Sequence, residues 1–343
     1  MSTLGSWDGL GAHGLTSALA DPCGEPYASV VLSDDGPVVA GGIPPAEVDI
    51  DERLVRGLLT AQHSDLASLH LRQVATGWDN VTYRLGDQLA VRLPRIGGAA
   101  ALITAEQTWL PWLDGHLPVA VPVPVRQGEP DAGFPWPWSV VPWVAGRTAD
   151  LEALDTSQAG VFGGFLASLH QQPPAGFPRN DYRGIPLTGL SEALEQRLAG
   201  LADLPDGDAG LPVSAEAIRD LWQEAVAAPI DVSEVCIHGD LHPRNLVVSQ
   251  GRLAAVLDWG DMTAGDPAAD LGAAWLLFPV AAHPAIWAAY GQVTAHTLAR
   301  AKGWAVHFGT TLLTLGLDGD KVLAETGRRT LERACQRDHG AVL

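Results

Sequence analysis

The stretch Val235-Cys-Ile-His-Gly-Asp240-Leu-His-Pro-Arg-Asn245-Leu-Val-Val248, with Leu253-Ala-Ala-Val-Leu-Asp258-Trp-Gly-Asp261 after it, decides how the rest of the chain is interpreted. Its apolar runs predict three short strands, and the Ser-Gln-Gly tripeptide at 249–251 predicts a hairpin turn between the last two. Polar residues fill the loop after the first strand and follow the third. Loops held between buried strands often carry catalytic or binding side chains, so this stretch is the candidate functional site.

The spacing of three polar residues narrows the chemistry. Asn245 follows Asp240 by five positions, and Asp258 comes thirteen positions later. Protein kinases place a catalytic Asp, an Asn and a metal-binding Asp in this order, with the same interval between the first two. Phosphoryl transfer to an alcohol needs a carboxylate that can orient the hydroxyl and accept its proton. It also needs hard oxygen ligands for Mg²⁺, which Asn and Asp side chains provide.

The same residues carry a resemblance to a known family. His238-Gly-Asp-Leu-His-Pro-Arg-Asn245 and Leu257-Asp-Trp-Gly-Asp261 resemble the aminoglycoside phosphotransferase family, kinase-like enzymes that inactivate antibiotics and that include macrolide phosphotransferases. The resemblance implies that Asp240 is the catalytic base and that Asn245 and Asp258 hold Mg²⁺. It also implies ATP or GTP as the phosphoryl donor. The acceptor would be a small-molecule hydroxyl, in the first place that of an aminoglycoside.

The resemblance further implies a bilobal, protein-kinase-like α+β fold. A small antiparallel-sheet N-lobe, expected over residues 46–145, would bind the nucleotide. A larger, mainly helical C-lobe, expected over residues 146–343, would carry the catalytic loop and the acceptor site. Residues 1–45 are rich in Gly, Ser, Asp and Pro without sustained periodicity, and they predict a poorly ordered extension.

A metal site of a different kind is the main competing interpretation of the loop. His238, Asp240 and His242 alternate, as in a His-x-Asp-x-His ligand set. That set accounts for neither Asn245 nor Asp258, so phosphoryl transfer is preferred. His238 is then expected to shape the loop through hydrogen bonds to the backbone.

Neighbouring polar residues are expected to have supporting roles. His242 and Arg244 could face solvent, and the resemblance assigns them no secure role. Asp261 could be a second Mg²⁺ contact or a turn cap, and the cap is preferred. The tract Gly265-Asp-Pro-Ala-Ala-Asp270-Leu271 resembles the family's continuation, and Asp270 is expected to bond back to the loop near His238.

Composition and charge exclude some classes of protein. Apolar residues make up 47% and charged residues 18% of the 343 positions, which is typical of a globular chain large enough for two lobes. The formal net charge of −19 argues against nucleic acid as a partner, because phosphate binding needs a basic surface. It suits a cationic small molecule such as an antibiotic, and no obligatory protein partner is evident.

Cysteine usage and hydropathy indicate a cytoplasmic protein without a membrane segment. Cys23, Cys236 and Cys335 are odd in number and far apart, so no disulfide framework is predicted. The N-terminus lacks a basic region followed by an apolar core. The most apolar stretch, residues 271–282, is shorter than a membrane span and is interrupted by Pro279.

Three strands in the first half of the chain are expected to form the nucleotide site. Runs at 69–74, 81–85 and 89–93 are separated by the turn Gly77-Trp-Asp-Asn80 and by a Gly-Asp turn. The first turn could lie over the phosphates, with Asn80 and backbone N–H groups as ligands. A single glycine is a weak signal, and a plain hairpin is the alternative.

Arg92 is expected to neutralise the phosphates of the nucleotide. Ala90-Val-Arg92 resembles the Ala-Ile-Lys of the third kinase strand, with Arg in place of Lys. The chain has no lysine before Lys302, and Arg92-Leu-Pro-Arg95 resembles a variant found in macrolide phosphotransferases. Helical spacing over 99–113 puts Glu106 on an apolar face, where a carboxylate needs a partner. The resemblance implies that Glu106 pairs with Arg92; a solvated Glu106 at the edge of the face is the alternative.

The connection between the lobes is expected after a second strand pair. Residues 119–125 and 138–144 predict two strands around a turn at 128–133. The hinge would then include Val141 and Trp143, whose backbone groups would meet the adenine edge while aliphatic side chains sandwich the ring.

The remainder predicts helices, with His170 as a core histidine rather than a catalyst. Acidic residues in segment 180–212 could receive the ammonium groups of an acceptor or simply face water. Helical spacing is found at 157–171, 270–282, 285–290, 295–315 and 321–335.

A nucleotide-binding pseudokinase is the alternative from a different functional class. The missing phosphate lysine and the single-glycine turn suggest it. The presence of Asp240, Asn245 and Asp258 favours an active enzyme.

Overall fold

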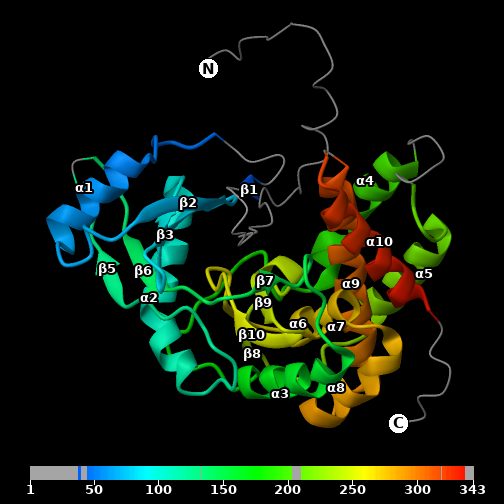
Figure 1. The fold of residues 1–343 in the computed structure, drawn as a ribbon. Helices are drawn as coiled ribbons and strands as arrows, with labels where there is room; N and C mark the ends of the chain where they lie inside the picture. Colours follow the sequence, from blue (N-terminus) through cyan, green and yellow to red (C-terminus); the bar gives the residue numbers. More distant parts are fainter. Residues whose placement is uncertain (1–37, 40–44, 132, 203–209, 318, 337–343) are drawn as a thin grey trace, which may run out of the picture.

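The chain folds into two lobes, each with its own apolar core (Figure 1). The computed structural model describes residues 38–39, 45–131, 133–202, 210–317 and 319–336. The bilobal α+β arrangement expected from the sequence is present, with a sheet in the first lobe and mainly helices in the second. The extension expected over residues 1–45 lies outside the described residues, apart from 38–39 and 45.

A six-stranded sheet forms the body of the first lobe. Its strands are β1 (Val38–Val39), β2 (Leu71–Thr76), β3 (Asn80–Leu85), β4 (Leu89–Pro94), β5 (Arg126–Gly128) and β6 (Trp138–Pro142). The order across the sheet is β1-β2-β3-β4-β6-β5. All neighbours run antiparallel except β1, which runs parallel to β2. The three strands expected before residue 94 are therefore confirmed.

The alternation of side chains gives this sheet two different faces. Val81, Tyr83 and Leu85 of β3 point into the core of the first lobe. Thr82 lies between them in sequence and pairs across the sheet with Arg92 of β4. The opposite face of the sheet thus carries polar groups toward the second lobe.

Two helices pack on the sheet. They are α1 (Glu52–Gln62) and α2 (Ala100–Asp114). α1 begins after Asp51, whose carboxylate accepts a hydrogen bond from the Leu54 N–H at 2.7 Å and so caps the helix. The inward face of α2 carries Glu106 among apolar residues, as its spacing predicted; its buried residues are Ile103, Glu106, Leu110 and Leu113.

The strand expected at 119–125 is absent. Pro122 and Pro124 interrupt this segment and Pro118 directly precedes it, and proline cannot donate to a strand ladder. The strand that pairs with β6 is instead β5, which starts at Arg126. The segment 119–125 crosses toward the second lobe, where the Val256 N–H donates to the Ala120 carbonyl at 3.0 Å.

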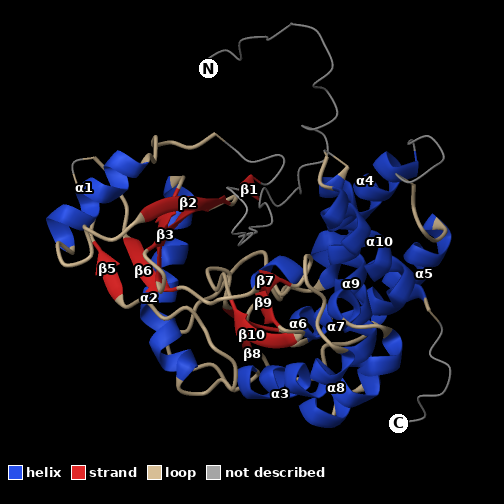
Figure 2. Cartoon of the chain, in the orientation of Figure 1, coloured by secondary structure: helices blue, strands red, loops and turns tan. Residues whose placement is uncertain are grey.

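Helices make up most of the second lobe (Figure 2). They are α3 (Ala159–Leu169), α4 (Ser191–Ala202), α5 (Ala215–Ala227), α6 (Ala268–Leu271), α7 (Ala273–Leu277), α8 (His283–Tyr290), α9 (Ala295–Gly316) and α10 (Lys321–Cys335). The long helix α9 is buried along most of its length and packs against α4, α5, α6, α7 and α10. It is the centre around which this lobe is assembled.

Two small sheets carry the stretch that decided the sequence interpretation. β8 (Val235–Ile237) pairs with β11 (Thr263–Gly265), and β9 (Leu246–Ser249) pairs with β10 (Arg252–Val256) and with β7 (Arg147–Thr148). The predicted hairpin turn at 249–251 is present, with positive φ at Gln250 (53°) and Gly251 (71°). All three strands predicted here are confirmed.

Within the described ranges, no single helix is long and apolar enough to cross a membrane. One pair, Ala268–Leu277 with Val280–Tyr290, reaches the required length and composition only when taken together, and it is bent by 120°.

Two adjacent glycines in α3 give a matched test of the packing between α3 and α8. A Cβ at Gly163 would lie 2.3 Å from the Ile286 carbonyl oxygen, whereas a Cβ at Gly164 would meet no atom within 4 Å. Gly163→Ala should therefore lower the free energy of unfolding by about 2 kcal/mol, because the clash is with backbone. Gly164→Ala should raise it by up to about 1 kcal/mol, the helix propensity gained over glycine. Urea denaturation measures both, and equal effects would contradict this packing.

Candidate active site

The loop after β8 is held mainly through its backbone. Asp270 of α6 accepts hydrogen bonds from the N–H groups of His238 (2.7 Å) and Gly239 (2.9 Å). Nε2 of His238 lies 2.9 Å from the carbonyl oxygen of Leu257, which directly follows β10. The supporting roles expected for His238 and Asp270 are confirmed. The loop is thus fixed before any ligand binds.

Asp240 and Asn245 face each other across this loop. Nδ2 of Asn245 donates to the main-chain oxygen of Asp240 at 2.9 Å and to its Oδ2 at 3.2 Å. Oδ1 of Asn245 and Oδ1 of Asp240 are both buried, and no described residue donates a hydrogen bond to either. Each side chain therefore offers one oxygen to something that the chain itself does not supply.

Asp258 lies next to this pair. It follows β10 in a left-handed conformation with φ of 58°. The N–H of the preceding Leu257 donates to the carbonyl oxygen of Asn245 at 2.7 Å. Oδ1 of Asp258 accepts from Nη2 of Arg92 at 2.8 Å, while Oδ2 is buried with no donor among the described residues.

Arg92 connects the two lobes at this point. Its Nη1 donates to both carboxylate oxygens of Glu106 at 2.7 Å, and its Nη2 reaches Asp258. Oε1 of Glu106 also accepts the N–H of Trp259 at 2.9 Å. The ion pair implied between Arg92 and Glu106 is present, and Glu106 is buried rather than solvated at the edge of its face.

The donor set fits Mg²⁺ better than the His-x-Asp-x-His alternative. The uncommitted oxygens of Asn245 and Asp258 are hard ligands of the kind that Mg²⁺ prefers. His238 and His242 instead use their ring nitrogens within the loop, since His242 Nδ1 accepts the Arg244 N–H at 3.3 Å. Within the described parts of the chain, no group of three or more side chains drawn from His, Cys, Asp and Glu is placed so that it could hold a metal ion.

A cavity between the lobes is lined by several residues predicted for the nucleotide site. Arg92, Val141, Trp143 and Asp258 all line it, together with Thr82. The N–H of Trp143 donates to the Gln88 carbonyl at 2.8 Å, and the Arg84 guanidinium lies 4.7 Å from the centre of the Trp143 ring. The structure thus brings Val141 and Trp143, the residues predicted for the hinge, to the same cavity as Arg92 and Asp258.

Asn80 is not among the residues that line this cavity. It begins β3 and is buried, and its carbonyl oxygen accepts the Gly77 N–H at 2.9 Å. Arg95, three residues after Arg92, donates to the carbonyls of Gly77 and Trp78 in the same turn. Arg95 therefore holds the turn, whereas Arg92 faces the cavity.

The family model described as the phosphotransferase enzyme family matches residues 70–304. The chain belongs to this phosphotransferase family. The matched range contains every residue predicted for the site.

Solved structures show the same fold in known phosphotransferases. The GDP complex of aminoglycoside 2'-phosphotransferase-IIIa matches at a TM-score of 0.62 and 19% identity, covering 83% of this chain and 99% of that one. The apoenzyme of macrolide 2'-phosphotransferase MphH from Brachybacterium faecium matches at a TM-score of 0.53 and 22% identity, covering 81% and 97%. At such identities the likeness shows the fold alone. The comparison with curated proteins gives no match.

The charge cluster at the lobe junction shifts the ionisation of its members. Burial alone would lower the pKa of Arg92, but Glu106 and Asp258 outweigh it and raise that pKa above its usual value. Burial raises the pKa of Glu106 and of Asp258, and Arg92 opposes the rise. Arg92 therefore remains charged at neutral pH and holds both carboxylates around it.

Asp240 is kept ionised by its neighbours. Burial alone would raise its pKa, but His242 and Arg183, followed by His238, outweigh burial and hold the pKa of Asp240 at about 2. A carboxylate with such a pKa is deprotonated throughout the neutral range, so it can accept a proton from a hydroxyl group.

Three expectations about the loop need correction. His242 and Arg244 do not face solvent, since both are buried. Arg244 pairs with Asp150 at 2.8 Å and with Asp320 at 2.5 Å, which lie far from it in sequence. Asp261 caps no turn with its side chain but accepts hydrogen bonds from Asn180 and from Arg183.

Arg183 is a site residue that sequence reasoning missed. It lies in the Gly- and Pro-rich connection between α3 and α4, where no periodicity marks individual positions. Its pairing with the motif residue Asp261 is visible only in three dimensions.

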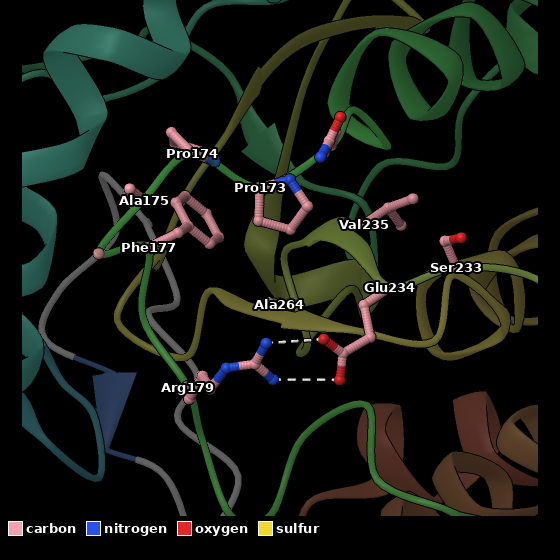
Figure 3. A pocket seen from close by; sticks show the side chains of 11 residues that line it. Pro173, Pro174, Ala175, Phe177, Arg179, Ser233, Glu234, Val235 and Ala264 are labelled. Carbon is pink, nitrogen blue, oxygen red and sulfur yellow. Dashed lines mark hydrogen bonds and ion pairs between the residues drawn. The ribbon is translucent and has the colours of Figure 1, made fainter.

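A second cavity lies apart from the lobe junction (Figure 3). It is lined by residues 172–177 and 233–235, and Arg179 and Glu234 pair across it with two hydrogen bonds of 3.1 and 2.7 Å. Figure 3 shows this pair beside the rings of Pro173 and Phe177. None of the residues predicted for the site lines it.

The pairing of Arg92 can be tested through stability. Glu106→Gln removes the charge from its bidentate partner and leaves a buried guanidinium partly uncompensated. The free energy of unfolding should fall by roughly 3 kcal/mol. Glu195→Gln is the matched control, because Glu195 pairs with Arg219 at the surface, where loss of a pair costs at most about 1 kcal/mol. Similar losses in both variants, measured by guanidinium denaturation, would contradict the assignment.

Proposed function

We propose that this phosphotransferase transfers the γ-phosphoryl group of ATP or GTP to a hydroxyl of a small molecule. The observation that carries the proposal is the set of uncommitted buried oxygens on Asp240, Asn245 and Asp258. Asn245 is hydrogen-bonded to Asp240, and the residue before Asp258 is hydrogen-bonded to Asn245. An inert structural network would satisfy such oxygens internally. Their placement beside Arg92 favours a site built for a metal-bound phosphate and an acceptor hydroxyl.

Each of the three oxygens has a task in this reaction. The acceptor hydroxyl loses its proton to Oδ1 of Asp240, and its oxygen forms a bond to the γ-phosphorus. The bond from that phosphorus to the β–γ bridging oxygen breaks, and a nucleoside diphosphate leaves. Mg²⁺, when bound by Asn245 and Asp258, supplies positive charge to the phosphate oxygens.

The nucleotide would lie in the cavity between the lobes, which has a volume of only about 30 Å³ here and must widen as the nucleotide enters. Arg92 would face the phosphates there, and Val141 and Trp143, which also line the cavity, would lie against the adenine or guanine ring. The Trp143 N–H is not available to the base edge, contrary to the sequence-based expectation, because it donates to the Gln88 carbonyl. Solved relatives of the same fold are complexes with GDP, with ATP and with ADP. We extend a purine nucleotide to this chain on the combination of fold and cavity, with ATP and GTP as equal candidates. We also propose that Asn80 and the turn that precedes it contact the phosphates of the nucleotide.

Asp240 is 1% exposed in this arrangement. A hydroxyl from solution cannot reach a carboxylate so enclosed, so acceptor binding must open a path to Oδ1.

An aminoglycoside is the proposed acceptor, and its transformation would inactivate the antibiotic. Relatives with this fold are described in complex with kanamycin and with gentamicin. The net charge of −19 suits a cationic ligand. A macrolide is the second candidate, because Arg92 stands where most kinases have lysine and because a macrolide phosphotransferase shares the fold.

Diphosphate release with Mg-ATP and with Mg-GTP tests the proposal against aminoglycosides, macrolides and other hydroxylated antibiotics. Release that depends on one drug class fixes reaction and acceptor, and mass spectrometry locates the phosphate. Asp240→Ala should lower kcat at least about 100-fold, because the hydroxyl loses its proton acceptor. Asp220→Ala, which removes an exposed carboxylate of α5 in the same lobe, should leave kcat unchanged.

Two results would count against the proposal. Near-normal turnover by Asp240→Ala would remove Asp240 from the chemistry. Nucleotide binding that needs no Mg²⁺, without turnover of any acceptor, would support the pseudokinase alternative instead.

A further inference from the structure

Arg183 lies in a segment, residues 178–183, that is hydrogen-bonded to β11. This strand pairs with β8, from which the proposed catalytic loop continues. The Ala264 N–H donates to the Pro178 carbonyl at 2.9 Å, and the Asn180 N–H donates to the Thr263 hydroxyl at 2.9 Å. The start of the segment therefore lies along β11, and these two hydrogen bonds hold it in place. Its side chains are placed by the same small sheet that places the loop.

The guanidinium of Arg183 is held beside the catalytic carboxylate by a dedicated partner. Nε and Nη2 of Arg183 both donate to Oδ2 of Asp261, at 3.1 and 2.8 Å. Oδ1 of Asp261 accepts from Nδ2 of Asn180 at 3.0 Å, so both carboxylate oxygens are occupied. A Cβ at Gly239 would lie 3.0 Å from Cβ of Arg183, and only glycine leaves this space. The orientation of Arg183 is thus fixed by Asp261, by the bond from Asn180 to Asp261, and by the close approach of Gly239.

The two oxygens of Asp240 face different surroundings. Oδ2 lies 3.2 Å from Nδ2 of Asn245 and 3.4 Å from Nε2 of His242. Oδ1 lies 3.8 Å from Nη2 of Arg183, beyond hydrogen-bond distance, and no described residue donates to it. Oδ1 is the oxygen left for an acceptor hydroxyl. The guanidinium of Arg183 therefore lies next to the point at which the new oxygen–phosphorus bond forms.

Positive charge in addition to that of Mg²⁺ would stabilise the transferred group at that point, and Arg92 is already paired with two carboxylates. The three peripheral oxygens of the transferred phosphoryl group carry the negative charge of the transition state. The chain has no lysine before Lys302, and Arg92 divides its guanidinium between Glu106 and Asp258. Arg183 is buried, so its charge would act with little screening by solvent.

We propose that Arg183 is a catalytic residue that contacts the transferred phosphoryl group from the acceptor side, with Asp261 holding its guanidinium in place. This inference rests on the function proposed above. The cation that neutralises the phosphoryl group during its transfer would then come from the second lobe, whereas Arg92 of the first lobe would contact the bound nucleotide. No new proton transfer is involved, since Arg183 stays protonated throughout.

Two other roles make different predictions. If Arg183 only braced Asp261, its loss would lower stability and leave the chemical step near normal. If Arg183 bound the acceptor alone, its loss would raise the KM for the acceptor and leave the acceptor-independent hydrolysis of the nucleotide unchanged. Contact with the phosphoryl group predicts a fall in both the transfer and the hydrolysis.

The test compares Arg183→Gln and Arg183→Lys with Arg179→Gln. Arg179 is the matched control, because it is an exposed arginine of the same segment whose partner is Glu234. Binding of Mg-ADP is measured by calorimetry with and without aluminium fluoride, which with ADP mimics the planar phosphoryl group. Turnover and the Tm of each variant are measured alongside.

The expected result is specific to the transition state. Arg183→Gln should bind Mg-ADP within about threefold of the unsubstituted protein, lose the tightening that aluminium fluoride produces, and lose at least about 100-fold in kcat. Arg183→Lys should recover part of both, and Arg179→Gln should match the unsubstituted protein. If Arg183→Gln fails to fold, the Lys variant decides, because it keeps a cation next to Asp261.

Three outcomes would overturn the inference. Undiminished tightening by aluminium fluoride in Arg183→Gln would show that Arg183 does not contact the phosphoryl group. A change confined to the KM for the acceptor would make it an acceptor ligand. A chain that shows neither tightening nor turnover dependent on Asp240 would remove the proposed function itself, which is a different failure, visible before any variant is made.

Discussion

The buried guanidinium of Arg92 is the interaction on which the arrangement of the site depends. It joins β4 and α2 of the first lobe to the residue that follows β10 in the second. A buried cation must be compensated, so neither Glu106 nor Asp258 can move away independently without a large electrostatic cost. The Trp259 N–H bonded to Glu106 adds a backbone link at the same point. These contacts fix the distance between β4, which carries Arg92, and Asp258, one of the expected metal ligands.

The proposed catalytic loop is held in place by a different set of contacts. Its backbone N–H groups are taken up by Asp270, and its neighbours Arg244 and Asp261 are paired with residues from distant parts of the second lobe. The loop therefore does not need its functional side chains for its own stability. This leaves one oxygen on each of Asp240, Asn245 and Asp258 without an internal donor. Pre-organised groups of this kind avoid a reorganisation cost when charge develops in the reaction.

Much of this could be predicted from the sequence, because the decisive signals are local. Short apolar runs at 235–237, 246–248 and 253–257 became strands, and the spacing from Asp240 to Asn245 placed two functional side chains on one loop. The remaining features depend on tertiary contacts. The strand expected at 119–125 failed because prolines remove its donors, and the burial of Arg244 depends on Asp150 and Asp320. Arg183 lay in a segment without periodicity, so only the fold brings it to Asp240.

The most direct test of the central claim is a crystal structure with a nonhydrolysable ATP or GTP analogue and Mn²⁺ in place of Mg²⁺. The account predicts an anomalous peak in coordination contact with Oδ1 of Asn245 and Oδ2 of Asp258, because Mn²⁺ accepts the same oxygen ligands. The phosphates should approach Arg92, and the base should lie against Val141 and Trp143. A metal ion held by other side chains, or a nucleotide bound outside the cavity between the lobes, would contradict it.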